Sequence, residues 1–146
     1  MFNAYHLYRM SHVLYLKKIP ILPHLIKLLI FLIYNSSIPY QAKIGSKSQF
    51  GYGGIGVVIH RNSILGKNCK IGSGVTIGGR SGHPKVPIIG DNVYLATGSK
   101  ILGPIKIGNN VTVGANAVVI NNVPDNAIVA GIPAKIIRIE NEKSKQ

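Results

Sequence analysis

The sequence predicts an all-β fold, a parallel β-helix in which short strands coil around an aliphatic core, preceded by a short helical segment. The first observation is a six-residue repeat that runs through most of the chain. The second is the placement of glycine, because residues 1–34 contain none and all 17 glycines lie within residues 36–139. The third is a hydrophobic content of 46% in 146 residues, which excludes a disordered chain and suffices for one packed domain.

Residues 1–35 form the first predicted domain, an N-terminal helical segment. We expect helices over residues 4–18 and 23–34, because prolines force a break between them. The second helix is apolar nearly all round, which indicates burial against the fold or against another subunit. A membrane span needs about 20 apolar residues, more than this run offers, so contact with a membrane is expected to be peripheral at most.

Residues 36–139 form the second predicted domain, the β-helix itself. In each repeat an aliphatic residue is followed by a small residue, two polar residues and a small or β-branched one. Three repeats make one triangular coil, and stacked coils bury a continuous core. Residues 140–146 are polar and are expected to fray. The aliphatic positions and their followers are Ile44-Gly45, Phe50-Gly51, Leu65-Gly66, Ile71-Gly72, Ile77-Gly78, Ile89-Gly90, Leu95-Ala96, Ile101-Leu102, Ile107-Gly108, Val113-Gly114 and Val119-Ile120.

His60 departs from the repeat, because a small residue is expected after Ile59 and an imidazole stands there instead. Steps of 18 residues from His60 reach Gly78, Ala96 and Gly114, so we expect these four residues to stack on one edge. That arrangement predicts an imidazole at one end of a smooth groove, which fits a thin, thiol-ended cofactor such as acetyl-CoA. The alternative is a corner histidine that packs or faces solvent.

An insert at residues 79–87 interrupts the repeat, since the aliphatic positions on either side lie twelve residues apart. It must leave the coil as a loop, and long loops on rigid scaffolds commonly carry function. It contains Arg80, His83 and Lys85 and no acid. Two interpretations remain open: a solvated basic loop, or a flap that brings His83 and the cations over a site in this subunit or the next.

The charge balance points to anionic partners, because 17 basic residues face four acids and the net charge is +13. Nucleic acid is not expected, since the basic residues are scattered and no helix-turn-helix, zinc-finger or RNP signature is present. Cys69 is the single cysteine, which excludes a disulfide framework and a cysteine-based zinc site and indicates a reducing compartment. As a nucleophile it is a weak candidate.

A resemblance to a known family is carried by three stretches, GVVIHRNSILGKNCKIGSGVTIGG, SGHPKVPIIGDNVYLATGSKILGPIKIG and VPDNAIVAGIPAKII. They resemble the serine acetyltransferase-like branch of the hexapeptide-repeat acyltransferases over about residues 37–138. Within that branch, the chain looks closest to O-acetyltransferases of capsule and lipopolysaccharide pathways. The resemblance implies a left-handed parallel β-helix of hexapeptide repeats, a homotrimer with active sites between subunits, and acetyl-CoA along a coil edge. It also implies a cytoplasmic enzyme, since acetyl-CoA is there.

The family's cofactor contacts match positions of this chain. The Gly-Gly turn after the third coil side and the Ala-Thr-Gly corner match the region that contacts CoA, and the segment 131–135 matches the turn where its nucleotide end lies. Basic residues would attract the phosphates. The cofactor-binding residues expected on this basis are Gly78, Gly79, Arg80, Ala96, Thr97, Gly114 and Lys135.

The family's catalytic residues match only in part. The family's aspartate before the first coil is replaced here by Ser37. Its Asp-His pair falls within Phe50-Gly51-Tyr52-Gly53 and is absent, while His83 matches the histidine of the family's loop. We therefore expect direct attack by the acceptor hydroxyl with His60 as general base, His83 assisting, and backbone N–H groups at the Gly-Gly turn as oxyanion donors. No metal is expected. The substrate-binding residues expected are Tyr52, Arg61, His83 and Lys85.

Four candidate functions are compatible with a β-helix of this kind, and the residues present favour them to different degrees. The first choice is acetyl transfer from acetyl-CoA to a sugar hydroxyl in surface-polysaccharide biosynthesis, and the alternative is serine O-acetylation. A γ-type carbonic anhydrase needs three histidine ligands, and only His60 and His83 lie in the coil region. A non-catalytic β-helix scaffold would not need a basic insert or an oversized corner residue.

Overall fold

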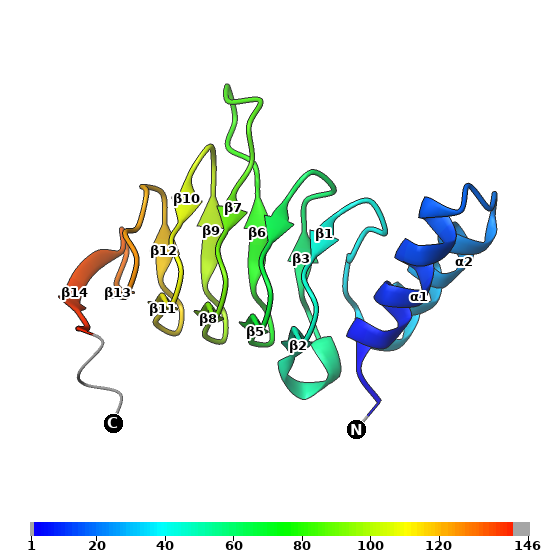
Figure 1. Ribbon diagram of the computed structural model, residues 1–146, viewed down its shortest axis with the longest axis horizontal. Helices are drawn as coiled ribbons and strands as arrows, with labels where there is room; N and C mark the ends of the chain where they lie inside the picture. The colour runs from blue at the N-terminus through cyan, green and yellow to red at the C-terminus, as the bar shows by residue number, and fades with distance from the viewer. Residues whose placement is uncertain (1, 142–146) are drawn as a thin grey trace.

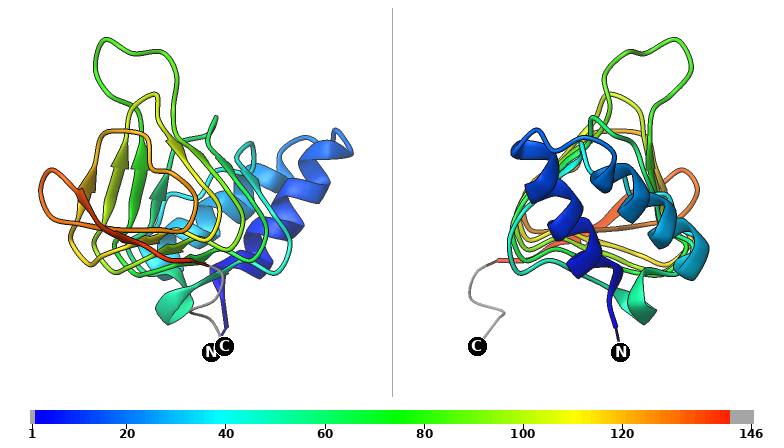
Figure 2. Two further views of the ribbon diagram at one scale, coloured as in Figure 1. Left: turned by 60° about the vertical axis from the view of Figure 1, so that its left-hand side comes forward. Right: turned by 90° about the vertical axis from the view of Figure 1, so that its right-hand side faces the viewer.

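The computed structural model describes residues 2–141, in which a helical hairpin is followed by a parallel β-helix (Figure 1). The hairpin consists of α1 (Ala4–Leu16) and α2 (Leu22–Tyr34), close to the two predicted helices. Figure 2 shows the hairpin lying across one end of the triangular coils. The predicted parallel β-helix with a short helical segment is confirmed.

The strands form three sheets, one for each side of the triangle, and all pairs between successive coils are parallel. A four-residue 3₁₀ turn, η1 (Gly51–Gly54), follows the second strand. Side one contains β1 (Lys43–Ile44), β4 (Ile64–Leu65), β7 (Ile88–Ile89) and β10 (Lys106–Ile107); side two contains β2 (Gln49–Phe50), β5 (Lys70–Ile71), β8 (Tyr94–Leu95), β11 (Thr112–Val113), β13 (Ala127–Ala130) and β14 (Lys135–Ile139); side three contains β3 (Val58–Ile59), β6 (Thr76–Gly78), β9 (Lys100–Leu102) and β12 (Val118–Val119).

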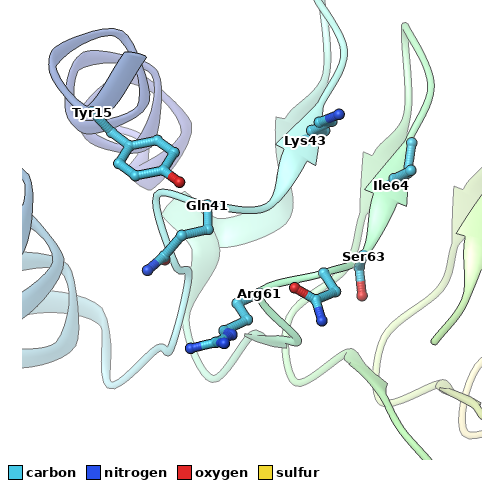
Figure 3. A pocket seen from close by; sticks show the side chains of 7 residues that line it. Tyr15, Gln41, Lys43, Arg61, Ser63 and Ile64 are labelled. Carbon is cyan, nitrogen blue, oxygen red and sulfur yellow. The ribbon is translucent and has the colours of Figure 1, made fainter. Parts of the chain in front are cut away.

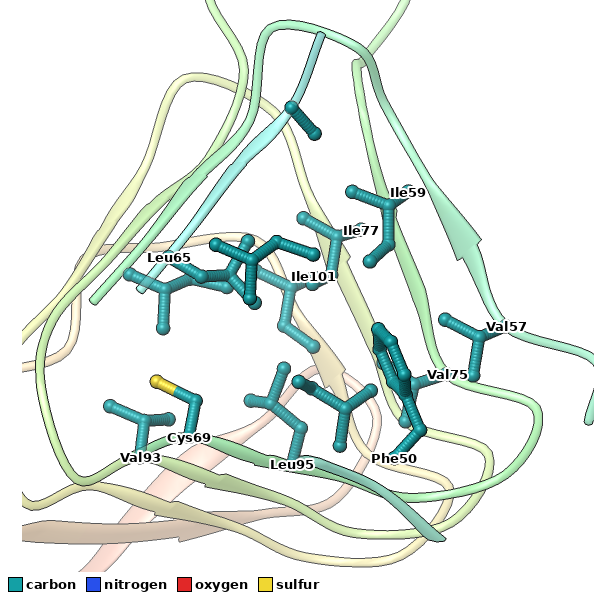
Figure 4. Close-up of a cluster of buried hydrophobic side chains, with 14 of the residues drawn as sticks. Phe50, Val57, Ile59, Leu65, Cys69, Val75, Ile77, Val93, Leu95 and Ile101 are labelled. Atoms are coloured by element: carbon teal, nitrogen blue, oxygen red, sulfur yellow. The ribbon is translucent and has the colours of Figure 1, made fainter. Parts of the chain in front are cut away.

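The core is a column of aliphatic side chains from all three sides (Figure 4). The second residue of most two-residue strands is buried and the first is more exposed, because successive side chains of a strand point to opposite faces. Ile71, Ile77 and Ile101 are at most 1% exposed. Cys69 points into the same column beside Val93, as Figure 4 shows.

The corner between sides one and two carries a ladder of asparagines. The Asn68 side chain donates to Asn92 at 2.9 Å, Asn92 to Asn110 at 3.1 Å, and Asn110 to Asn126 at 3.1 Å. All four have positive φ, a conformation that asparagine tolerates better than most residues. We call this edge the asparagine corner. Because these side chains hydrogen-bond to one another within the fold, we interpret the asparagine corner as stabilising the coil rather than binding a ligand.

The α1 helix is fixed to the first coil by buried tyrosines. The Tyr8 hydroxyl donates to the Ala42 carbonyl at 2.5 Å and accepts from the Ile44 N–H at 3.1 Å, and Tyr8 is fully buried. Burial raises the pKa of Tyr8 to about 12. Within one chain α2 is buried only in part, at four residues that include Ile26 and Ile30, and its expected burial against another subunit stays a prediction.

The last strand closes the other end of the β-helix. β14 runs antiparallel to β13, and the turn before it covers β12 through the hydrogen bond from the Ala134 N–H to the Val118 carbonyl. Glu140, expected to fray, still donates its N–H to the Asn126 carbonyl at 2.8 Å. The remainder of the predicted tail, residues 142–146, lies outside the described residues. Among residues 2–141, no helix combines the length and hydropathy that crossing a bilayer requires.

Candidate functional site

The predicted edge of His60, Gly78, Ala96 and Gly114 is not continuous in the structure. Ile59 pairs with Ile77, which sets His60 beside Gly78 as expected. The next partner of Gly78 is Leu102, however, so neither Ala96 nor Gly114 continues this edge.

The insert explains the difference. Ile77 pairs with Ile101, 24 residues ahead, because the loop takes six residues that do not form a side of the triangle. Counting in steps of 18 treats those six as a repeat and assigns every later residue to the wrong corner. The edge that contains His60, between sides three and one, is here called the histidine corner.

The corner between sides two and three carries the smooth edge that the sequence predicted elsewhere. The strand register stacks five residues without a side chain beyond Cβ, and we call this edge the small-residue corner. A hollow of about 300 Å³ lies at its N-terminal end, lined by Tyr52 and Thr97 among others. The stacked residues are Gly51, Gly72, Ala96, Gly114 and Ala130.

Tyr52 marks the N-terminal end of the small-residue corner. It lies in η1 with φ of 50°, and its side chain is 73% exposed beside the hollow. At the opposite end, Lys135 is paired with Ala130 across the β13–β14 turn. Five of the predicted site residues therefore lie along the small-residue corner: Tyr52, Ala96, Thr97, Gly114 and Lys135. Three others lie at the histidine corner: Gly78, Gly79 and Arg80.

The ring of His60 is held by its own turn. Its Nδ1 lies 3.1 Å from the backbone nitrogen of Asn62, whose N–H donates to it. The lone pair of Nδ1 is thus engaged, so the neutral imidazole carries its proton on Nε2. In this arrangement Nε2–H is a hydrogen-bond donor. A general base at Nε2 would need the other tautomer.

The insert projects from the histidine corner beyond the outline of the coils (Figures 1 and 2). Arg80 and His83 form an isolated antiparallel bridge, in which the His83 N–H donates to the Arg80 carbonyl at 3.0 Å. Arg80, His83 and Lys85 are all exposed. Lys85 also lines a hollow of about 600 Å³ between the insert and side one.

Arg61 lines a separate pocket of about 510 Å³ between α1 and side one. Figure 3 shows Tyr15 projecting from α1 toward Gln41, with Arg61 and Ser63 along the chain that follows His60. Gln41 Oε1 and Ser63 Oγ are buried and have no hydrogen-bond partner within residues 2–141. Sequence reasoning missed Gln41 and Ser63, because the folding of distant segments, not a motif, brings them together.

Cys69 is unsuited to nucleophilic attack. It is fully buried, and desolvation raises the pKa of its thiol. Its Sγ lies 3.3 Å from the Gly90 carbonyl oxygen, inside the core. Among residues 2–141 there is also no group of three or more His, Cys, Asp or Glu residues that could hold a metal ion.

Known proteins share both the repeat and the architecture. Residues 87–121 match the family described as bacterial transferase hexapeptide (six repeats). Over 138 residues the chain is 38% identical to a serine acetyltransferase of Synechococcus elongatus, covering 93% of this chain and 56% of the relative.

Two solved structures extend the comparison to three dimensions. A serine acetyltransferase of Brucella abortus strain S19 in complex with coenzyme A superposes with a TM-score of 0.88 at 30% identity, covering 94% of this chain and 56% of that one. A Neisseria gonorrhoeae serine acetyltransferase in complex with serine gives a TM-score of 0.83 at 34% identity, covering 90% and 54%. The chain therefore spans about half the length of the relatives it matches.

Proposed function

The chain carries the bacterial transferase hexapeptide repeat and is a homologue of serine acetyltransferases, and from this premise we propose that it is an acetyl-CoA-dependent O-acetyltransferase whose acceptor is L-serine. The observation that carries the proposal is the small-residue corner, an edge of five stacked residues that leaves room for a thin, extended co-substrate. The similarities favour L-serine over the sugar hydroxyl that the sequence ranked first.

The small-residue corner fits acetyl-CoA along its length. Ala96 and Gly114 present no side chain beyond Cβ, so a pantetheine arm can approach the backbone. Lys135 at the end of the corner offers a cation to the phosphates, as Arg80 and Lys85 of the insert would from a neighbouring subunit. Bound there, the co-substrate supplies an activated acetyl group.

In this proposal His60 acts as a hydrogen-bond donor. Its Nε2–H can stabilise the oxyanion that forms on the thioester carbonyl, since its Nδ1 is already engaged by Asn62. This supports a donor role better than the general-base role that the sequence suggested. The His83 side chain has no hydrogen-bond partner within the described residues and is exposed, so it is free to accept the proton of the attacking hydroxyl. When the C–S bond of the thioester breaks, the same proton passes to the departing CoA sulfur, which leaves as the free thiol.

The two corners lie on different edges of one chain, and we propose that a homotrimer completes the site. The histidine corner with its insert and the small-residue corner are the two edges of side three. Packing against a neighbour would bring the insert and His60 of one subunit to the small-residue corner of the next. Co-substrate supply places the enzyme in the cytoplasm.

A sugar hydroxyl is the second candidate acceptor. The resemblance places an aspartate of the family at Ser37 and its Asp-His pair within residues 50–53, and this chain has neither. Within that segment Tyr52 offers an exposed aromatic ring beside the hollow. Such a ring has an apolar face and a polar tip, which suits a sugar. This observation alone favours a glycan.

The experiment is thiol release from acetyl-CoA by the purified chain, with L-serine in one series and nucleotide-sugars or surface oligosaccharides in the others. Release that depends on L-serine supports the first proposal. Thiol release only with a sugar would overturn L-serine as the acceptor and support acetyl-CoA as the co-substrate. No release with any acceptor, from protein that is folded by circular dichroism, would refute the enzymatic proposal.

A further inference from the structure

Large apolar side chains cover the outer face of the helical hairpin. Within α2 only a stripe that includes Ile26 and Ile30 is buried, so the rest of this apolar helix faces away from the coils. Contiguous exposed patches of this kind mark interaction sites. We define the helix patch as six residues of α2 that are 43–70% exposed, namely Leu25, Leu28, Leu29, Phe31, Leu32 and Ile33.

The patch extends into the connection between the helices. Ile21 is 73% exposed and Leu16 is 64% exposed. Leu16 directly precedes Lys17, and Ile21 follows Lys18 by three residues. Lys17 and Lys18 are exposed in this connection. The apolar surface and the cations therefore occupy the same end of the molecule.

All the charged side chains around the helix patch are positive. Lys17, Lys18 and Lys27 lie in the hairpin, and their ammonium groups have no ion-pair partner among residues 2–141. Residues 1–90 contain no acid at all, because the first acid of the sequence is Asp91. Within residues 2–141, no acidic side chain is paired with these cations.

We propose that the helix patch docks on the surface of an anionic lipid bilayer. An apolar face about as long as α2, edged by lysines, lies in the plane of the interface with its side chains among the acyl chains. The lysines then meet anionic headgroups. Because α2 has 13 residues, it is too short to span the bilayer and would lie along it.

A second copy of the chain fits the helix patch less well. Pairing two or three such faces would cover the apolar residues but would bring Lys17, Lys18 and Lys27 of each copy together. With no acid in residues 1–90 to intervene, these like charges would repel. An anionic bilayer satisfies both the apolar surface and the charge.

Docking of the helix patch leaves both candidate corners accessible. The hairpin lies across one end of the coils, whereas the insert projects to the side (Figure 2). If the proposed homotrimer forms around an axis along the coils, all three patches face the same way and bind together. The docking itself does not depend on the proposed acetyl transfer.

The test is co-sedimentation of the full chain with vesicles of phosphatidylcholine alone or with phosphatidylglycerol added, at low and high salt. We expect binding to the anionic vesicles that weakens with salt. The variant L28S/L32S should lower the partition coefficient by about tenfold or more, and K17Q/K18Q should weaken binding to anionic vesicles only.

The matched control is I136S/I137S, which removes two exposed apolar residues of β14 at the opposite end. It should bind vesicles as the unmodified chain does. Equal binding of L28S/L32S and the unmodified chain would overturn the proposal. So would a change in sedimentation velocity of L28S/L32S without lipid, because the patch would then be a subunit interface. Thiol release measured in solution is a separate readout, so failure of docking and failure of the enzymatic proposal remain distinguishable.

Discussion

The backbone N–H of Asn62 donates a hydrogen bond to Nδ1 of His60 across 3.1 Å. This contact within one corner decides which nitrogen of the imidazole is available and which carries the proton. The neutral imidazole of His60, the residue that departs from the repeat, is therefore a hydrogen-bond donor at Nε2. The role of His60 can therefore be tested by side chains that keep or remove that donor.

Replacing His60 by Gln and by Ala separates the donor from the base. Gln can donate from its terminal amide but cannot accept a proton at neutral pH, so a donor role predicts that H60Q keeps turnover within about tenfold of the unmodified enzyme. H60A should lose about 10²–10³-fold. The measurement is kcat for thiol release; equal, large losses in both variants would restore the base role.

A bulky residue on the small-residue corner should block the co-substrate. Thr97→Trp places an indole beside the hollow, and we expect the KM for acetyl-CoA to rise by about tenfold or more. Lys67→Trp is the control, because Lys67 holds the same repeat position at the asparagine corner and is also exposed. Steady-state kinetics that show the same KM for both variants would remove the co-substrate from this corner.

Shortening the insert should abolish activity and keep the fold. Deletion of residues 81–86 together with Arg80→Asn leaves six residues from Ile77 to Ile89, which is one ordinary repeat with asparagine at the turn position. The melting temperature should therefore stay within a few degrees of the original. Thiol release should fall to background if His83 accepts the proton. His83→Ala alone, in the intact loop, distinguishes loss of the imidazole from loss of the loop.

Tyr8→Phe should destabilise the hairpin in a pH-dependent way. The change leaves the Ala42 carbonyl and the Ile44 N–H without partners, at a cost of about 1–3 kcal/mol at neutral pH. Burial raises the pKa of Tyr8 to about 12, above its usual value of 10.0, so the stability that neutral Tyr8 provides is complete below pH 10 and is lost between pH 10 and 12.

The stability difference between Y8F and the unmodified chain should accordingly narrow above pH 10, by about 1.4 kcal/mol at pH 11 and by about 2.7 kcal/mol above pH 12. Urea unfolding at pH 8 and pH 11 measures it. A difference that stays constant across this range would mean that Tyr8 ionises as easily in the folded chain as in the unfolded one.

The architecture was predictable because its signals are local. Prolines at 20 and 23 separate the two helices, and the six-residue period defines which side chains face the core. The corner assignment of Ala96 was wrong although the insert was predicted to be a loop, because steps of 18 residues were continued through the insert as if six of its residues formed a side of the triangle. Gln41 and Ser63 were missed for a related reason, since only the packing of α1 on the first coil encloses them.

Both ends of the β-helix are closed by elements that do not continue its repeat, the helical hairpin at one end and the antiparallel β14 at the other. A parallel coil with bare ends would present matching rows of N–H and C=O groups, and one molecule could stack on the next without limit. The two caps make the coil a particle of fixed length. Removal of β14 alone would uncover only one end, because the hairpin still closes the other, and filaments would require the loss of both caps.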